Sequence, residues 1–146
     1  MRKTTSAADL GLTLAADDEQ ALFGWFLASY LFGKRISQRI AAQTWAVIYR
    51  KHGRDTPRKL LNLSWQQLVD QLGEGHHYRR YDESTATLLL DACRHLQEEY
   101  QGRFARLRDA SADRADFERR LQVLKGVGPK TCEIFMREAG PLLYPG

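Results

Sequence analysis

The sequence is poor in cysteine, and the two cysteines that it has are not placed for a disulfide framework or a metal cluster. Cys93 and Cys132 stand alone inside apolar helical patterns, which predicts buried free thiols in a reducing, cytoplasmic environment. Zinc and iron–sulfur sites need sets of cysteines that this sequence does not contain. We therefore expect neither a metal site nor an iron–sulfur cluster.

Long hydrophobic runs and strand-like alternation are also missing. No window approaches the roughly 18 consecutive apolar residues of a membrane span, and residues 1–6 start basic without the apolar core of a secretory signal. No segment alternates at strand spacing, and no repeat recurs at a fixed period. The sequence predicts an all-α fold, with short, sharply connected helices in a compact orthogonal arrangement rather than an up-and-down bundle.

The composition is that of one globular domain. The chain has 146 residues, and 43% hydrophobic against 27% charged residues excludes a disordered polymer. Residues 1–16 are small and polar and predict a flexible tail, which leaves 17–146 as a single helical domain. The net charge of +4 is compatible with a polyanionic partner but does not require one.

Apolar periodicity, interrupted by glycine and proline, predicts a series of helices. The expected spans are 17–32, 36–52, 57–61, 65–72, 83–100, 117–124 and 129–139, with 103–113 partly helical and a long loop over 73–81. The first helix is apolar around most of its circumference, so it should be central and buried. Gly140-Pro141 should end the last helix.

The most informative stretch is 124–131, Leu-Lys-Gly-Val-Gly-Pro-Lys-Thr, between two predicted helices. Its glycines allow positive φ and leave no Cβ between the main chain and a ligand. The amides of the turn and of the helix that starts at Pro129 should point outward together, and such a terminus attracts phosphate. Lys125 and Lys130 add positive charge. A tight connection with solvated lysines is the alternative, but the surrounding pattern favours a phosphate site.

Two further basic clusters could join this stretch in one groove, although the sequence does not show that they converge. The predicted DNA-binding residues are Lys125, Gly126, Val127, Gly128, Lys130, Thr131, Lys34, Arg35, Arg79 and Arg80. Between the clusters, His76 and His77 have no third ligand nearby and are more typical of an exposed loop than of a metal site.

Residues Leu124 to Phe135 resemble the helix–hairpin–helix motif of the endonuclease III superfamily of base-excision DNA glycosylases, whose usual form is L-P-G-V-G-x-K-T-A. The likeness continues over residues 20–139, for example in Thr56-Pro57 followed by leucines, which is similar to that family's T-P-x-x-L-x-x-L-S step. The resemblance implies a six-helix module in which a helix–hairpin–helix at 117–139 grips one DNA strand.

The resemblance also implies an enzymatic role for Lys130, which occupies the position of the nucleophilic lysine in bifunctional members. Its amine would attack C1′ of a flipped-out nucleotide, expel the base and leave a Schiff base. The sequence departs from the family elsewhere. Nothing in 137–146 resembles the G-V/I-D-T-H segment that carries the catalytic aspartate, and Lys125 replaces the usual proline. Lys34-Arg35 stands in place of a glutamine-type wedge. Base excision should then be slow or absent.

Several functions therefore stay open. One is a DNA glycosylase or AP lyase of base-excision repair that uses Lys130. Others are a helix–hairpin–helix module that only binds DNA, a module completed by a partner subunit that supplies the missing lobe, or a protein-interaction domain. The resemblance further implies a monovalent cation held by the carbonyls of the hairpin.

Overall fold

The computed structural model describes residues 5–75 and 79–146, and within them every regular element is helical, which confirms the all-α prediction. The elements are η1 (Ala8–Leu10), α1 (Glu19–Phe32), α2 (Gln38–Trp45), its π-helical continuation η2 (Ala46–Lys51), α3 (Pro57–Leu61), α4 (Trp65–Glu74), α5 (Arg79–Tyr100), α6 (Phe104–Ala110), α7 (Arg114–Leu121) and α8 (Pro129–Leu143). No helix in these ranges is long and apolar enough to cross a bilayer.

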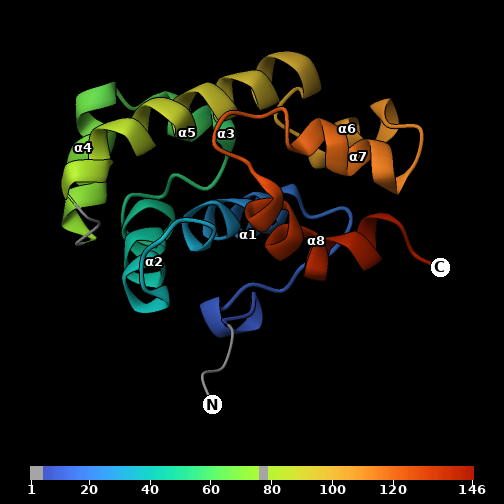
Figure 1. Cartoon of the computed structure of the whole chain (residues 1–146), viewed down its shortest axis with the longest axis horizontal. Coiled ribbons are helices and arrows are strands. Elements are labelled where there is room, and N and C mark those ends of the chain that lie inside the picture. The colour runs from blue at the N-terminus through green and yellow to red at the C-terminus, as the bar shows by residue number, and fades with distance from the viewer. Residues whose placement is uncertain (1–4, 76–78) are drawn as a thin grey trace.

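Helix α1 lies at the centre of the fold, as its apolar circumference predicts. Residues 21–31 are all buried, and α1 packs against α2, α6 and α8 (Figure 1). The ring of Phe26 lies 5.4 Å from that of Phe104 and 6.0 Å from that of Phe135, measured between centroids. Aromatic pairs at these distances add to the free energy gained by burial alone. The core therefore joins three helices that are distant in sequence.

Two indole groups fix the neighbours of α1. The Trp25 Nε1 atom donates to the carbonyl oxygen of Phe135 at 3.2 Å, and Trp45 Nε1 donates to that of Gly24 at 2.8 Å. Each bond satisfies a polar atom that burial would otherwise leave unpaired. They connect α1 to α8 and to α2. Helix α8, which begins within the 124–131 stretch, is therefore held directly on the core.

The last helix does not end where the sequence predicts. Helix α8 continues through Gly140 and Pro141 to Leu143. A proline inside a helix removes one hydrogen bond and is unfavourable, but Leu143 is buried and the Tyr144 ring packs against Phe117 at 5.7 Å. These contacts explain why the final turn persists.

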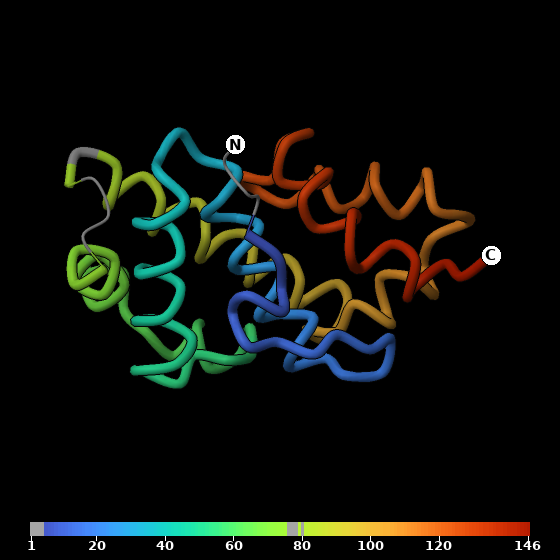
Figure 2. Tube along the Cα trace, turned by 90° about the horizontal axis from the view of Figure 1, so that it is seen from below, coloured from blue at the N-terminus to red at the C-terminus, as the bar shows by residue number. Residues whose placement is uncertain are grey.

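Residues 5–12, which the sequence predicts as part of a flexible tail over 1–16, make packing and hydrogen-bond contacts with the helices, and residues 1–4 lie outside the described residues. Ala7 and Leu12 are buried in the main core, and the Ala7 amide donates to Glu138 Oε2 at 3.0 Å. The Thr5 amide donates to Gln38 Oε1 at 2.9 Å. Residues 5–12 therefore lie along α2 and α8 (Figure 2).

Glu19 provides a first testable effect on stability. Helix α6 has no side-chain cap of its own, and the Glu19 carboxylate accepts from the amides of Phe104 at 2.6 Å and Ala105 at 3.0 Å. Glu19→Ala should lower the free energy of unfolding by about 1–3 kcal/mol, because two amides lose a charged acceptor. Urea unfolding measures the change. Glu19→Gln keeps one acceptor and should lose less, so equal losses would contradict this role.

Candidate nucleic-acid interface

The turn at residues 122–128 connects α7 to α8 and is built on two buried side chains. Leu124 and Val127 point into the core, and the Val127 amide donates to the Leu124 carbonyl at 3.1 Å. Between them Gly126 has φ +80°, a conformation that favours glycine. We refer to residues 122–128 as the α7–α8 turn. Between these buried anchors, Lys125 is exposed and Gly126 is half-buried.

Two side chains from the end of α1 hold this turn. The Tyr30 hydroxyl donates to the Lys125 carbonyl at 2.9 Å, and Lys34 Nζ donates to the Gly126 carbonyl at 3.2 Å. A Cβ at position 126 would stand 1.9 Å from the Tyr30 hydroxyl oxygen. Burial raises the pKa of Tyr30, so its hydroxyl stays neutral and keeps its proton to donate. The turn is therefore fixed by the core and not by its own sequence alone.

Helix α8 begins at the turn with unused amide groups. Gly128 is the residue before the helix and contributes no capping side chain, and Pro129 has no amide hydrogen. Within the described ranges, the amides of Lys130 and Thr131 meet no acceptor, since the first helical bond runs from Cys132 to Gly128. A Cβ on Gly128 would meet nothing within 4 Å, and Lys130 is exposed, whereas Thr131 is buried. This geometry suits an anion.

The two lysines predicted from the sequence flank this helix start. Lys125 and Lys130 are both exposed, and neither side chain has a hydrogen bond or an ion pair within the part of the chain that the structure describes. Lys130 borders a cavity of about 240 Å³ beside α8, together with Glu133 and Arg137. The two ammonium groups are therefore available to an external anion.

Val127 and Thr131, also predicted to bind DNA, turn their side chains inward. Both are buried, and the Thr131 hydroxyl packs so closely on Gly33 that a Cβ there would lie 2.1 Å from its oxygen. The exposed fractions of the whole residues are only 4% for Val127 and 3% for Thr131, so neither residue offers much surface to a ligand. Thr131 instead positions α8 on the end of α1.

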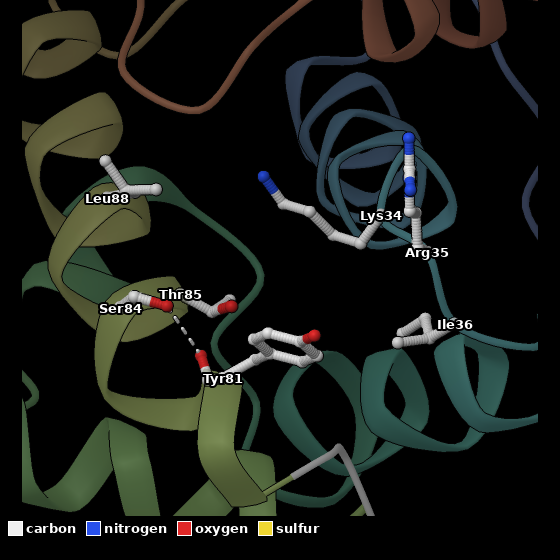
Figure 3. A pocket seen from close by; sticks show the side chains of 7 residues that line it. All are labelled: Lys34, Arg35, Ile36, Tyr81, Ser84, Thr85 and Leu88. Atoms are coloured by element: carbon white, nitrogen blue, oxygen red, sulfur yellow. Dashed lines mark hydrogen bonds between the residues drawn. The ribbon is translucent and has the colours of Figure 1, made fainter.

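Lys34 and Arg35 border a second cavity, of about 260 Å³, between the α1–α2 connection and α5 (Figure 3). Arg35 is exposed, whereas Lys34 is half-buried and its ammonium lies 4.5 Å from the centroid of the Tyr30 ring. Burial lowers the pKa of Lys34. The sequence singled out these two cations but did not indicate that α5 lies opposite them and lines the cavity with Tyr81, Ser84, Thr85 and Leu88.

Arg79, which belongs to the remaining predicted basic cluster, does not lie beside the turn. Arg79 is exposed at the start of α5 and borders a cavity shared with Asp70, Asp82 and Glu83 between α4 and α5, not the α7–α8 turn. The side chain of Arg80 and residues His76 and His77 fall outside the described residues. Of the two further basic clusters, the one with Lys34 and Arg35 lies next to the turn, because Lys34 bonds to Gly126.

Comparison with protein-family models, curated proteins and solved structures finds no match to this chain. The likeness to endonuclease III thus rests on the sequence pattern quoted above.

Candidate metal sites are not evident among the described residues. No group of three or more His, Cys, Asp or Glu side chains there is placed to hold a metal. Cys93 and Cys132 are buried free thiols, as predicted, and burial raises the pKa of Cys93 to about 12. At the turn, the Lys125 and Gly126 carbonyls, which would be candidate ligands of the monovalent cation, already accept from Tyr30 and Lys34.

Proposed function

We propose that this protein binds DNA of the kind processed in base-excision repair, with the α7–α8 turn and the start of α8 as its contact to the phosphate backbone. The observation that supports this most is the exposed start of α8. Within the described residues, the Lys130 amide has no acceptor, and the exposed side chains of Lys125 and Lys130 have no ion pair. Phosphate is the ligand that such a terminus favours.

Backbone recognition would carry little sequence information. Contacts to phosphate oxygens fix the position of a protein on DNA, while base-edge contacts specify sequence. The exposed groups at the turn are amides and ammonium groups, which suit phosphate oxygens. Arg35 is exposed on the adjoining α1–α2 connection and would extend the same positive surface. We expect similar affinity for duplexes of unrelated sequence.

The test is the salt dependence of binding to a fluorescently labelled duplex, measured by anisotropy. Binding through phosphates releases counterions, so the logarithm of the association constant should fall linearly with the logarithm of salt concentration. Lys125→Gln and Lys130→Gln should each reduce the steepness of that line by about 0.9, the value for one phosphate contact on B-DNA.

Lys51→Gln is the matched control, because it removes the same charge from an exposed lysine that pairs with Glu74 on α4. Its salt slope should equal that of the unmodified protein. Binding that does not weaken with salt, or equal slopes for all three variants, would refute the phosphate site and favour the protein-interaction alternative.

A module that binds DNA without chemistry is the second candidate. It is favoured by the exposure of Lys130, because nucleophilic lysines are commonly activated in desolvated pockets and Lys130 is not enclosed in one. Borohydride trapping on abasic-site DNA separates the two candidates. A covalent adduct would support the lyase class, and its absence together with intact DNA binding would support the non-catalytic module.

A further inference from the structure

The cavity next to the α7–α8 turn contains a lysine whose surroundings differ from those of Lys130. Figure 3 shows the Lys34 side chain extending from the α1–α2 connection toward α5, above the side chains of Tyr81 and Thr85. The cavity of about 260 Å³ is large enough for a ring of sugar size. The same lysine donates to Gly126 in the turn, so the cavity and the candidate phosphate site are adjacent.

The Lys34 amine is half-buried and has no carboxylate partner in the described part of the chain. Its recorded contacts are the Gly126 carbonyl at 3.2 Å and the face of the Tyr30 ring at 4.5 Å. The ring face attracts an ammonium, but the net effect of burial is to lower the pKa of Lys34. A neutral amine can still donate one hydrogen to Gly126 and leaves its lone pair free. A half-buried position without a carboxylate partner and a lowered pKa are both typical of a nucleophilic lysine.

We propose that Lys34, rather than Lys130, is the nucleophilic amine of this protein, and that it reacts with an aldehyde carried on a DNA strand, such as the ring-opened sugar of an abasic site. The proposal rests on the proposed function, because the phosphate next to the aldehyde would lie on the α7–α8 turn. It extends that function by naming the reacting atom and the functional group that it attacks.

The reaction requires no external cofactor. The lone pair of Lys34 Nζ forms a bond to the aldehyde carbon, the C=O π bond breaks toward oxygen, and one proton passes from the nitrogen to that oxygen, which gives a carbinolamine. The nitrogen then loses its remaining proton and the carbon loses the hydroxyl group as water, so that amine plus aldehyde yields imine plus one water molecule. Thr85 borders the cavity with a hydroxyl group that can donate to the carbonyl oxygen.

The first experiment identifies the reacting lysine in the unmodified protein. The full chain is incubated with a duplex that contains one abasic site in the presence of cyanoborohydride, digested, and mapped by mass spectrometry. The reduced adduct should lie on Lys34. An adduct on Lys130 or on another lysine would overturn the assignment, as would no adduct under conditions in which the duplex is bound.

The second experiment compares three arginine variants. Lys34→Arg keeps a cation that can donate to Gly126 but has no nucleophilic amine, and it should lower the trapping rate at least about tenfold. Lys51→Arg, at an exposed lysine that pairs with Glu74 on α4, should stay within about twofold of the unmodified protein. Thermal unfolding and affinity for an undamaged duplex are measured alongside. If Lys130→Arg abolishes trapping and Lys34→Arg does not, the proposal is wrong.

A small probe separates this proposal from the DNA-binding proposal. Deoxyribose 5-phosphate carries the same aldehyde and a phosphate but needs no duplex. With cyanoborohydride it should label Lys34 faster than Lys51, which is exposed on a different part of the surface. Preferential labelling without salt-dependent duplex binding would refute the DNA contact and retain the reactive amine. Salt-dependent duplex binding together with equal labelling of Lys34 and Lys51 would retain the DNA contact and refute the reactive amine.

Discussion

Phe26→Ala should lower the free energy of unfolding by about 3–5 kcal/mol, the range for deleting a fully buried aromatic side chain. Phe26 is inaccessible to solvent at the middle of α1, and its ring meets those of Phe23, Tyr30, Phe104 and Phe135. The cavity left by alanine would be bordered by rigid rings, which relax poorly into empty space. Urea unfolding followed by circular dichroism gives the change directly.

Val123→Ala is the control for this prediction. Val123 is 57% exposed in the α7–α8 turn, so truncating it removes apolar surface that water already contacts. Its effect should stay within about 0.5 kcal/mol. If Phe26→Ala and Val123→Ala differed by less than about 1 kcal/mol, the central position of α1 in the core would be contradicted.

The helices themselves could be predicted because their signals are local. Helix α1 lacks a polar face, and such a helix has to be surrounded by others. Ser64 and Gln67 form a capping box at the start of α4, and both of its bonds are present. Thr56-Pro57 likewise gives α3 a capping side chain and a proline in its first turn. Each of these features depends only on residues within or next to one helix.

The ends of the chain could not be predicted, because tertiary contacts override their local signals. Gly140-Pro141 is a strong stop signal, yet the burial of Leu143 holds the helix for another turn. Ala7 and Leu12 lie in a polar, small-residue segment that reads as a tail. Their burial depends on a surface formed by α2 and α8, to which the Glu138 carboxylate contributes an acceptor. Sequence periodicity contains no information about that surface.

In the candidate site, too, the local features could be predicted from the sequence and the tertiary contacts could not. The turn, its glycines and its two lysines could be read from one short stretch. The contacts that shape it could not, because Tyr30 and Lys34 precede their carbonyl partners by 95 and 92 positions. The cavity beside Lys34 has the same origin, since its α5 wall is set by tertiary packing. Whether a lysine is exposed or enclosed decides its chemistry, and this distinction between Lys130 and Lys34 needed the structure.

The second large effect on the free energy of unfolding is expected at the glycines of the turn. Substitution of Gly126 should be costly, whereas substitution of Gly128 should not. Gly126→Ala should lower the free energy of unfolding by about 2–4 kcal/mol, because alanine at φ +80° is strained and its Cβ would displace the buried Tyr30 hydroxyl from Lys125. Gly128→Ala should change it by less than about 1 kcal/mol, since φ is −98° and a Cβ there meets nothing within 4 Å.

The same pair tests the phosphate site independently of charge. A methyl group on Gly128 extends into open space at the residue before α8, where the proposed phosphate would contact the helix start. Gly128→Ala should therefore weaken duplex binding about tenfold, equivalent to about 1.4 kcal/mol, while the protein unfolds at nearly the same urea concentration. Because this substitution alters neither charge nor core, full-strength binding by Gly128→Ala would mean that DNA does not approach the start of α8. The lysines at 125 and 130 would then act only as a diffuse positive charge.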